Sequence, residues 1–276
     1  MSRKAASPLS SSLDTAIRVG VFVYLGFLVV LPLSVLLERG FTGGITGIYR
    51  AVTSPEAAAA LRLTLGTAAA CALINGVLGT AAAWILVRYR FPGRTLLSTL
   101  IDLPLAIPTL VTGIMLVLLF GPVSPLGRAF GEMGMPIAFK SPAIVLALAF
   151  VSFPYSVRTV EPVLMELDPA EEEAAWTLGA SSRLTFVKVV LPALLPAVIS
   201  GALQCFARAL AEFGSIIVVS GNIPFSTLTA PVFIFGEVES GRAESAAAIS
   251  IVLLAVALIM TAGARASERF VRSANA

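Results

Sequence analysis

The sequence predicts an all-α integral membrane protein with six transmembrane helices, on the basis of its composition and its long apolar stretches. Of its 276 residues, 57% are hydrophobic and 13% are charged, and the mean hydropathy is +0.94. An average soluble domain is about 45–50% apolar and about 25% charged, so a soluble core could not bury so many apolar side chains. Helices are the expected spanning element, because each backbone polar group inside a bilayer must be bonded within the protein. We expect one transmembrane domain over residues 1–276.

Six apolar stretches approach the roughly 20 residues that a helix needs to cross a bilayer. The first is too long for the apolar region of a signal peptide, so we expect it to be retained as a helix. The third carries Pro104 and Pro108 near its start, which should bend it or delay its onset. The fourth is short and is interrupted by Pro154. The stretches cover residues 17–37, 63–87, 98–120, 142–157, 194–219 and 246–264.

The lysines and arginines predict the orientation, because cytoplasmic segments of membrane proteins carry an excess of both. With the N-terminus inside, twelve of the 19 fall in cytoplasmic segments, six in outer segments and one inside a span. The cytoplasmic set is Arg3, Lys4, Arg18, Arg88, Arg90, Arg94, Arg158, Arg183, Lys188, Arg265, Arg269 and Arg272. Both termini are therefore expected in the cytoplasm.

The residue content argues against several classes of protein. The chain has no histidine, two cysteines and a net charge of +3. Its positive charges are spread along the chain, which does not favour nucleic-acid binding. Cys71 and Cys205 lie inside apolar runs, and no metal-ligand spacing occurs. We expect the two cysteines to pack between helices without a disulfide, and we expect neither a metal site nor catalytic residues.

The longest cytoplasmic loop, residues 158–192, is the least apolar part of the chain and contains a well-capped helix. Asp168 can cap its N-terminus, Pro169 takes the first helical position, and Glu171 stands where a capping box requires an acidic residue. The helix should end at Gly179, a residue type that suits a left-handed C-terminal position.

The rest of this loop predicts a second short helix. Ser181 or Ser182 can cap it, and it should end before Leu191-Pro192. The first helix also carries the small residues Ala174 and Ala175 in its middle, which would let the backbone of another protein approach closely. An ordinary capped surface helix would have the same caps, so cap chemistry by itself leaves both interpretations open.

The loop resembles the EAA motif of ABC importer permeases, written as EAA, three residues, G, nine residues and then I-x-L-P. This chain keeps that spacing and departs from it only by a valine in place of the isoleucine, at Val189. The matching residues are Glu173, Ala174, Ala175, Gly179, Leu191 and Pro192. The resemblance implies the type I ABC importer permease fold, in which this loop is a coupling helix that docks in a groove of a separate ATPase subunit. Rigid-body movement of the ATPases would then rock the helices between inward-open and outward-open states.

The resemblance also implies the other parts of the machine. No G-x-x-x-x-G-K-[ST] phosphate loop occurs, and none of Lys4, Lys140 and Lys188 follows a glycine. A non-catalytic chain without a cofactor of its own is therefore expected, with ATP and magnesium held by the ATPase. The implied partners are two ATPase subunits, a second permease subunit (a homologous heterodimer is favoured), an extracytoplasmic sulfate-binding protein and membrane lipid. The implied location is the bacterial cytoplasmic (inner) membrane, as a multi-pass protein.

Three short segments narrow the expected cargo: IDLPLAIPTLV, RALAEFGS and SGNIPFSTLTAP. They resemble permeases of the sulfate/thiosulfate (CysT-type) family, with Ala211 where glycine is common in relatives. A molybdate or tungstate permease is the first alternative, because these anions are alike in shape and charge. An ion-coupled secondary transporter should show inverted repeats and several intramembrane ionisable groups, and the sequence has one ion pair and no obvious repeat. A membrane enzyme would need nucleophile, base or metal ligands, which find little support here.

Arg208 and Glu212 stand out because Arg208 falls roughly halfway along the fifth span. An arginine at the bilayer centre costs on the order of 3 kcal/mol by insertion scales. Glu212, four residues later on the same helix face, is within pairing reach. The pair either acts on the anion, as a local positive potential or a gate, or it ties the fifth span to its neighbours. Both interpretations stay open at this point.

A sulfate dianion keeps its charge at neutral pH, so its path should offer N–H and O–H donors. The candidates inside the spans are Asn75, Thr109, Thr112, Ser152, Ser215 and Ser220. Side chains of these types also bond one membrane helix to another, and for any one of them that packing role is the expectation.

Overall fold

The computed structural model describes the backbone of residues 8–274 and the side chains of residues 13–267, and within this part it has helices and no strand. Five helices are long and apolar enough to cross a membrane, and the number is six when the bent pair α4–α5 is counted as one span, in agreement with the predicted fold class. The elements are α1 Pro8–Gly40, α2 Gly44–Thr53, α3 Pro55–Arg88, α4 Arg94–Ala106, α5 Thr109–Phe120, α6 Pro125–Glu132, α7 Ser141–Glu166, α8 Pro169–Thr177, α9 Ser182–Thr185, a π-helical turn Phe186–Val190, α10 Leu191–Leu210, α11 Gly214–Val219, α12 Ala230–Glu239 and α13 Ala243–Ala274.

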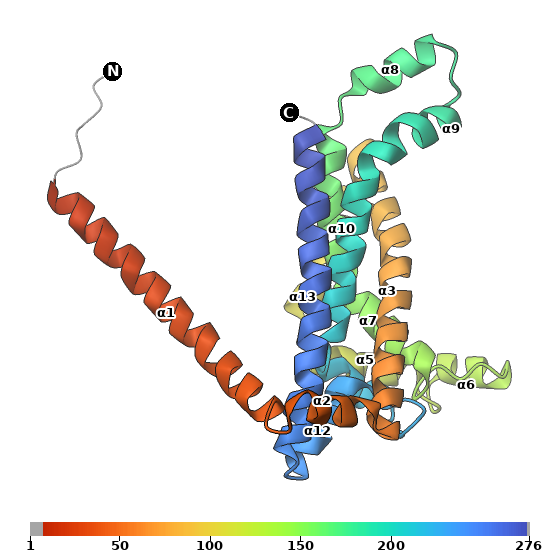
Figure 1. The fold of residues 1–276 in the computed structure, drawn as a ribbon. Helices are drawn as coiled ribbons and strands as arrows, with labels where there is room; N and C mark the ends of the chain where they lie inside the picture. The colour runs from red at the N-terminus through yellow and green to blue at the C-terminus, as the bar shows by residue number, and fades with distance from the viewer. Residues whose placement is uncertain (1–7, 275–276) are drawn as a thin grey trace.

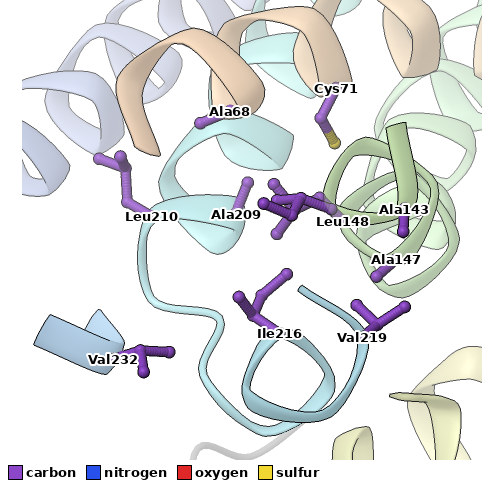
Figure 2. Packing of buried hydrophobic residues seen from close by; sticks show 11 residues of the cluster. Ala68, Cys71, Ala143, Ala147, Leu148, Ala209, Leu210, Ile216, Val219 and Val232 are labelled. Atoms are coloured by element: carbon purple, nitrogen blue, oxygen red, sulfur yellow. The ribbon is translucent and has the colours of Figure 1, made fainter. Parts of the chain in front are cut away.

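Four long helices, α3, α7, α10 and α13, run side by side and form the body of the molecule (Figure 1). Small side chains bring them close: Ala68 and Cys71 of α3 lie in one buried cluster with Ala143 and Ala147 of α7 and Ala209 of α10 (Figure 2). Small residues are typical of helix contacts in membranes, where close backbone approach does the work that the hydrophobic effect does in water.

The two ends of the bundle carry different elements. At one end lie α8 and α9, the end of α3, the start of α10 and the end of α13, and at the other lie α2, α6 and α12 (Figure 1). The described charges that were assigned to the cytoplasm belong to segments at the α8 end, except Arg18, which lies on α1 away from the bundle. Arg3 and Lys4, and the side chains of Arg269 and Arg272, lie outside the described residues.

Helix α1 leans away from the bundle and contacts its neighbour α2 and part of α13 (Figure 1). None of its most apolar window is buried, and Phe22 and Phe27 are 76% and 67% exposed. In water such a surface would be unfavourable, but lipid tails are as apolar as leucine. The helix is therefore stable against lipid without protein covering it.

The third predicted span, residues 98–120, is broken into α4 and α5, which meet at an angle of 110°. Pro108 causes the break, because a proline disfavours the helical conformation in the residue before it, and Ile107 is extended at φ −84° and ψ 126°. Pro104 lies inside α4 without ending it. The expected bend is therefore present, at the second of the two prolines.

The fourth span is not short. Helix α7 has 26 residues and includes both Pro154 and Pro162, whereas the predicted stretch covered residues 142–157. Pro154 is buried between neighbouring helices, and membrane helices tolerate proline where neighbours and local adjustments compensate for the lost bond. The helix also extends beyond the apolar stretch, because its last turns carry polar residues at the end of the bundle.

The prediction that a second short helix ends before Leu191-Pro192 is wrong. The helix runs without a break from Ser182 to Leu210, and a π turn precedes the proline. In that turn the Leu191 N–H donates to the carbonyl oxygen of Phe186, five residues back. The wider turn accommodates Pro192, which lacks an N–H and whose ring would clash with a carbonyl in a regular α-helix.

The fifth span, predicted as residues 194–219, is interrupted near its end. Helix α10 stops at Leu210, and the short α11 begins at Gly214. Between them Glu212 turns back to the chain, and its Oε1 accepts hydrogen bonds from the backbone N–H and the hydroxyl of Ser215, both at 3.0 Å. A side chain that bonds the local backbone offers it an alternative to the continuous helix.

Candidate functional site

Helix α8 is held at both ends by the residues that the sequence singled out. The carboxylate of Asp168 accepts a hydrogen bond from the Ala170 N–H at 2.9 Å, one residue earlier than a capping box through Glu171 would use. At the other end Gly179 has a φ of +84°. The Gly179 N–H donates to the Trp176 carbonyl at 2.9 Å and the Ala180 N–H to that of Ala175 at 3.0 Å, which together close the Schellman pattern. The predicted left-handed position is confirmed.

The outer face of α8 is open. Glu173, Ala174 and Gly179 are exposed and Ala175 is half-buried, so four of the six motif residues lie on or next to one accessible surface. Two large apolar side chains that the motif does not include join them, Trp176 at 50% exposure and Leu178 at 89%. Aromatic residues are enriched in the cores of protein interfaces. This surface can therefore receive a partner protein.

The last two motif residues lie elsewhere. Leu191 and Pro192 begin α10, after the π turn, and do not belong to the α8 surface. Their position suggests a different contribution, because the proline and the wider turn fix how α9 and the loop before it join the spanning helix.

An ion pair that sequence reasoning missed ties α8 to the bundle. Arg88, at the end of α3, bonds the carboxylate of Glu172 on the inner side of α8. The guanidinium also lies over the ring of Trp84, 5.2 Å from its centroid, and Trp84 packs edge-on against Phe186 of the π turn at 5.3 Å. The two charged residues are 84 positions apart, so no local pattern could have paired them.

A second arginine links α4 to α7 at the same end. Arg158 donates from Nε to Asp102 at 2.9 Å and from Nη2 to the carbonyl and the hydroxyl of Ser98 at 3.0 and 2.8 Å. It also bonds Glu161, one turn along its own helix. The sequence analysis counted Arg158 only as an orientation signal. In the structure it fixes the first half of the broken third span to α7.

The predicted pair of Arg208 and Glu212 forms, at the point where the fifth span is interrupted. Arg208 Nη1 lies 2.8 Å from Glu212 Oε2. Glu212 is only 2% exposed, whereas the arginine side chain is 28% exposed. The pair was expected on one face of a continuous helix, but Glu212 lies past the helix end. It therefore connects α10 to the start of α11.

The two interrupted spans meet here. Half-helices α5 and α11 pack directly together, and glycines allow it: a Cβ at Gly113 would lie 2.6 Å from the Ser215 carbonyl oxygen, and one at Gly214 would lie 2.2 Å from Thr109 Oγ1. Thr112 Oγ1 is buried there without a hydrogen-bond partner among the described residues. Discontinuous helices that meet inside a membrane are a common setting for transport sites.

The other polar candidates serve packing. Asn75 Nδ2 donates to Ser152 Oγ and to the Ala149 carbonyl, both at 3.0 Å, and the Cys71 sulfur lies 3.1 Å from Ser152 Oγ. Cys71 and Cys205 are free thiols. Ser220 lies apart from this network and bonds Asn222 at 2.7 Å. The internal bonds of Asn75 and Ser152 join α3 to α7, which is the packing role expected for them.

Comparison with known proteins gives concordant results. The family model described as "Binding-protein-dependent transport system inner membrane component" matches residues 75–273. The probable sulfate transport system permease protein cysT of Chlorokybus atmophyticus is 41% identical over 240 residues, which are 87% of this chain and 84% of the relative. The sulfate transport system permease protein CysT of Escherichia coli is 40% identical over 259 residues, 94% of this chain and 92% of the relative.

Two solved structures share the fold at low sequence identity. A chain of a bacterial alginate ABC transporter, crystallised with an alginate-bound periplasmic protein, superposes with a TM-score of 0.77 at 16% identity and covers 95% of this chain and 96% of its own. A chain of the MetNI methionine ABC transporter gives a TM-score of 0.57 at 18% identity, over 78% of this chain and 94% of its own.

Proposed function

The chain belongs to the family of binding-protein-dependent transport system inner membrane components, and from this premise we propose that it is the membrane-spanning permease subunit of an ATP-driven ABC importer for sulfate or thiosulfate. The cargo assignment rests on the 40% identity to the sulfate permease of Escherichia coli over 92% of that protein. The subunit lies in the bacterial cytoplasmic membrane. ATP and magnesium bind to a separate ATPase, and this chain is non-catalytic.

The α8 end of the bundle faces the cytoplasm in this proposal. The excess of lysine and arginine in the segments at that end supports the orientation. Glu173, Ala174, Ala175 and Gly179, with the exposed Trp176 beside them, then form the surface that docks into the ATPase.

Three attachments transmit a displacement of α8 to the spans. The chain joins α8 to α7 on one side and, through Gly179 and α9, to α10 on the other. The bond between Arg88 and Glu172 joins it to α3, and Arg158 passes the movement of α7 on to α4. Rocking of α8 by the ATPase therefore moves three of the four body helices together, as alternating access requires.

The anion passes next to the junction of α5 and α11, with Arg208 and Glu212 as its gate. The partly exposed guanidinium supports this role, because it presents positive potential while Glu212 stays buried behind it. The exposed guanidinium attracts a dianion, and the carboxylate of Glu212 beside it weakens that attraction, so that release remains fast.

The complete importer contains further subunits. Two ATPase subunits, a homologous second permease in a heterodimer and an extracytoplasmic sulfate-binding protein complete it. The exposed face of α8, with Trp176 and Leu178, supports the presence of a neighbouring subunit.

Uptake of radiolabelled sulfate in cells that lack this gene tests the cargo, with molybdate uptake measured in parallel. We expect the deletion to abolish sulfate uptake and the wild-type gene to restore it. Loss of molybdate uptake with normal sulfate uptake would show that the cargo is molybdate and would leave the permease assignment intact. Loss of neither would contradict the proposed function.

A further inference from the structure

A long apolar groove of about 1170 Å³ opens on the side of the bundle at the α8 end. One wall is α3, along which the lining runs from Gly76 to Tyr89, and the other includes Leu97 of α4 and Leu191 and Val198 of α10. The floor is formed mainly by aliphatic and aromatic side chains. The groove lies outside the junction of α5 and α11 and outside the exposed face of α8.

The length of the groove matches one leaflet of a bilayer. A helix rises 1.5 Å per residue, so the stretch from Gly76 to Tyr89 is about 20 Å long. Half of the hydrocarbon core of a bilayer measures about 15 Å. The groove therefore reaches from near the bilayer centre to the level of the lipid headgroups. Tyr89, 57% exposed, lies at the headgroup end of the groove. Tyrosine is enriched at this level in membrane proteins.

Two arginines stand at the mouth, one from each wall. Arg90 follows α3, and Arg183 belongs to α9. Both are exposed, and neither forms a salt bridge with any side chain that the structure describes. Their neighbours at the same end differ, because Arg88 and Arg158 are each paired with carboxylates. The mouth therefore carries two positive charges that the protein leaves without a counter-ion.

We propose that this groove is a binding site for an anionic phospholipid of the cytoplasmic leaflet. One acyl chain lies along Val77 and Ile85, and the phosphate lies between Arg90 and Arg183. Basic pockets between membrane helices bind anionic headgroups in this way. A free inorganic anion would use the two arginines but would leave the apolar length of the groove empty. The inference rests on the membrane location of the chain and on its proposed orientation, and not on its cargo.

The site adjoins the transmission elements. Phe186 lines the groove and packs against Trp84, whose ring carries the guanidinium of Arg88. A bound acyl chain therefore supports the segment that joins α8 to α10. Anionic lipid should strengthen the coupling between ATP hydrolysis and transport.

Native mass spectrometry of the assembled transporter tests the site, after release from nanodiscs that contain phosphatidylglycerol and phosphatidylcholine. One arginine near a membrane surface contributes about 1 kcal/mol to anionic lipid binding, or about a five-fold change in affinity. We expect Arg90→Gln and Arg183→Gln each to lower phosphatidylglycerol retention about five-fold. Arg128→Gln, an exposed arginine at the opposite end, is the matched control and should not change it. Equal retention in all four proteins would overturn the proposal.

A photo-crosslinker identifies the occupant of the groove. Attached to a Val77→Cys variant of the assembled transporter, a benzophenone should label phosphatidylglycerol, whereas the same probe at Leu118→Cys on α5 should label lipid without preference for headgroup. Labelling of the second permease at position 77 would show that protein covers the groove and would overturn the lipid site. Displacement of phosphatidylglycerol by inorganic sulfate would overturn it too, because the arginines would then serve the transported anion.

Discussion

Arg88 and Glu172 join the end of the spanning helix α3 to α8, and they do so beside an aromatic contact between Trp84 and Phe186. The two side chains are about 24% and 14% exposed, so water screens their attraction only in part. The arginine also stacks on Trp84, which restricts its freedom. The orientation of α8 thus depends on contacts within this chain before any partner binds.

Removal of this ion pair should loosen coupling. In Glu172→Gln, α8 loses a charged bond worth about 1 kcal/mol, and part of the ATPase movement no longer reaches α3. We expect the number of ATP molecules hydrolysed per sulfate transported to rise about two- to five-fold in proteoliposomes. Glu171→Gln, an exposed neighbour on the same helix, should leave the ratio unchanged. An unchanged ratio in both variants would show that the pair does not orient α8.

The conformation of Gly179 can be separated from its surface. Its φ is +84°, and a Cβ there would meet nothing within 4 Å, so the backbone and not space limits substitution. Asparagine tolerates this conformation, whereas a β-branched residue in it costs about 1–2 kcal/mol. We expect Gly179→Asn to keep most sulfate uptake and Gly179→Val to lose most of it at equal membrane abundance. Equal loss in both would mean that the partner requires a bare backbone at this position.

A single and a double variant distinguish a gate role of Arg208 from a structural role. Arg208→Gln alone leaves the buried Glu212 without its cation, which costs about 3 kcal/mol or more, and should lower membrane abundance. The neutral double variant with Glu212→Gln should recover abundance. We expect sulfate uptake per molecule of the double variant to stay at least about ten-fold below wild type, since the positive potential is gone. Normal uptake per molecule would assign the pair to packing.

The contact of α5 with α11 predicts a steep cost for one methyl group. In Gly113→Ala the new Cβ would lie 2.6 Å from a backbone oxygen of Ser215, and overpacking of this kind costs about 1–3 kcal/mol. Gly66→Ala is the control, because a Cβ at this helical glycine meets nothing within 4 Å. We expect the Tm of the purified transporter to fall for Gly113→Ala and to stay equal or rise for Gly66→Ala. A fall in both would point to a cause other than crowding.

The stability of the protein should depend on pH because of Glu237, which lies outside the spanning segments. The hydrogen bond from Arg242 holds the pKa of Glu237 below its ordinary value of 4.5, against the opposing effect of burial. A carboxylate whose folded pKa is depressed adds stability above the unfolded pKa and loses it as the pH falls through the folded pKa. The Tm difference between wild type and Glu237→Gln should therefore be largest near neutral pH and shrink below 4.5. Glu239→Gln, at an exposed position, should show no such difference.

The sequence could predict the elements whose signals are local. Exposure to lipid requires apolar side chains, so each predicted apolar stretch falls on described helices in the same order, although the third and the fifth are interrupted. The caps of α8 also depend on neighbouring residues, and both Asp168 and Gly179 behave as their types predict. The pairing of Arg208 with Glu212 could be predicted because the two residues are only four positions apart.

The interruptions and the long-range bonds could not be predicted in the same way. Hydropathy reports contact with lipid and not helix continuity, and both halves of a broken span are apolar. The stop after Leu210 depends on where the Glu212 side chain turns, which the packing of α11 decides. Arg88 and Glu172 are brought together only by the fold, and the roles of the coupling and gate residues stay predictions.

The π turn at Phe186–Val190 sets the rotation of the preceding loop about the axis of the spanning helix α10. It holds one residue more than a regular turn, and each residue of a helix corresponds to a rotation of about 100°. Deletion of a single residue there would turn everything on its N-terminal side by that angle relative to α10. Phe186 would leave Trp84, and α8 would present a different face to its partner while every spanning helix stayed in place. The rotational alignment of α9 with α10 thus depends on one inserted residue.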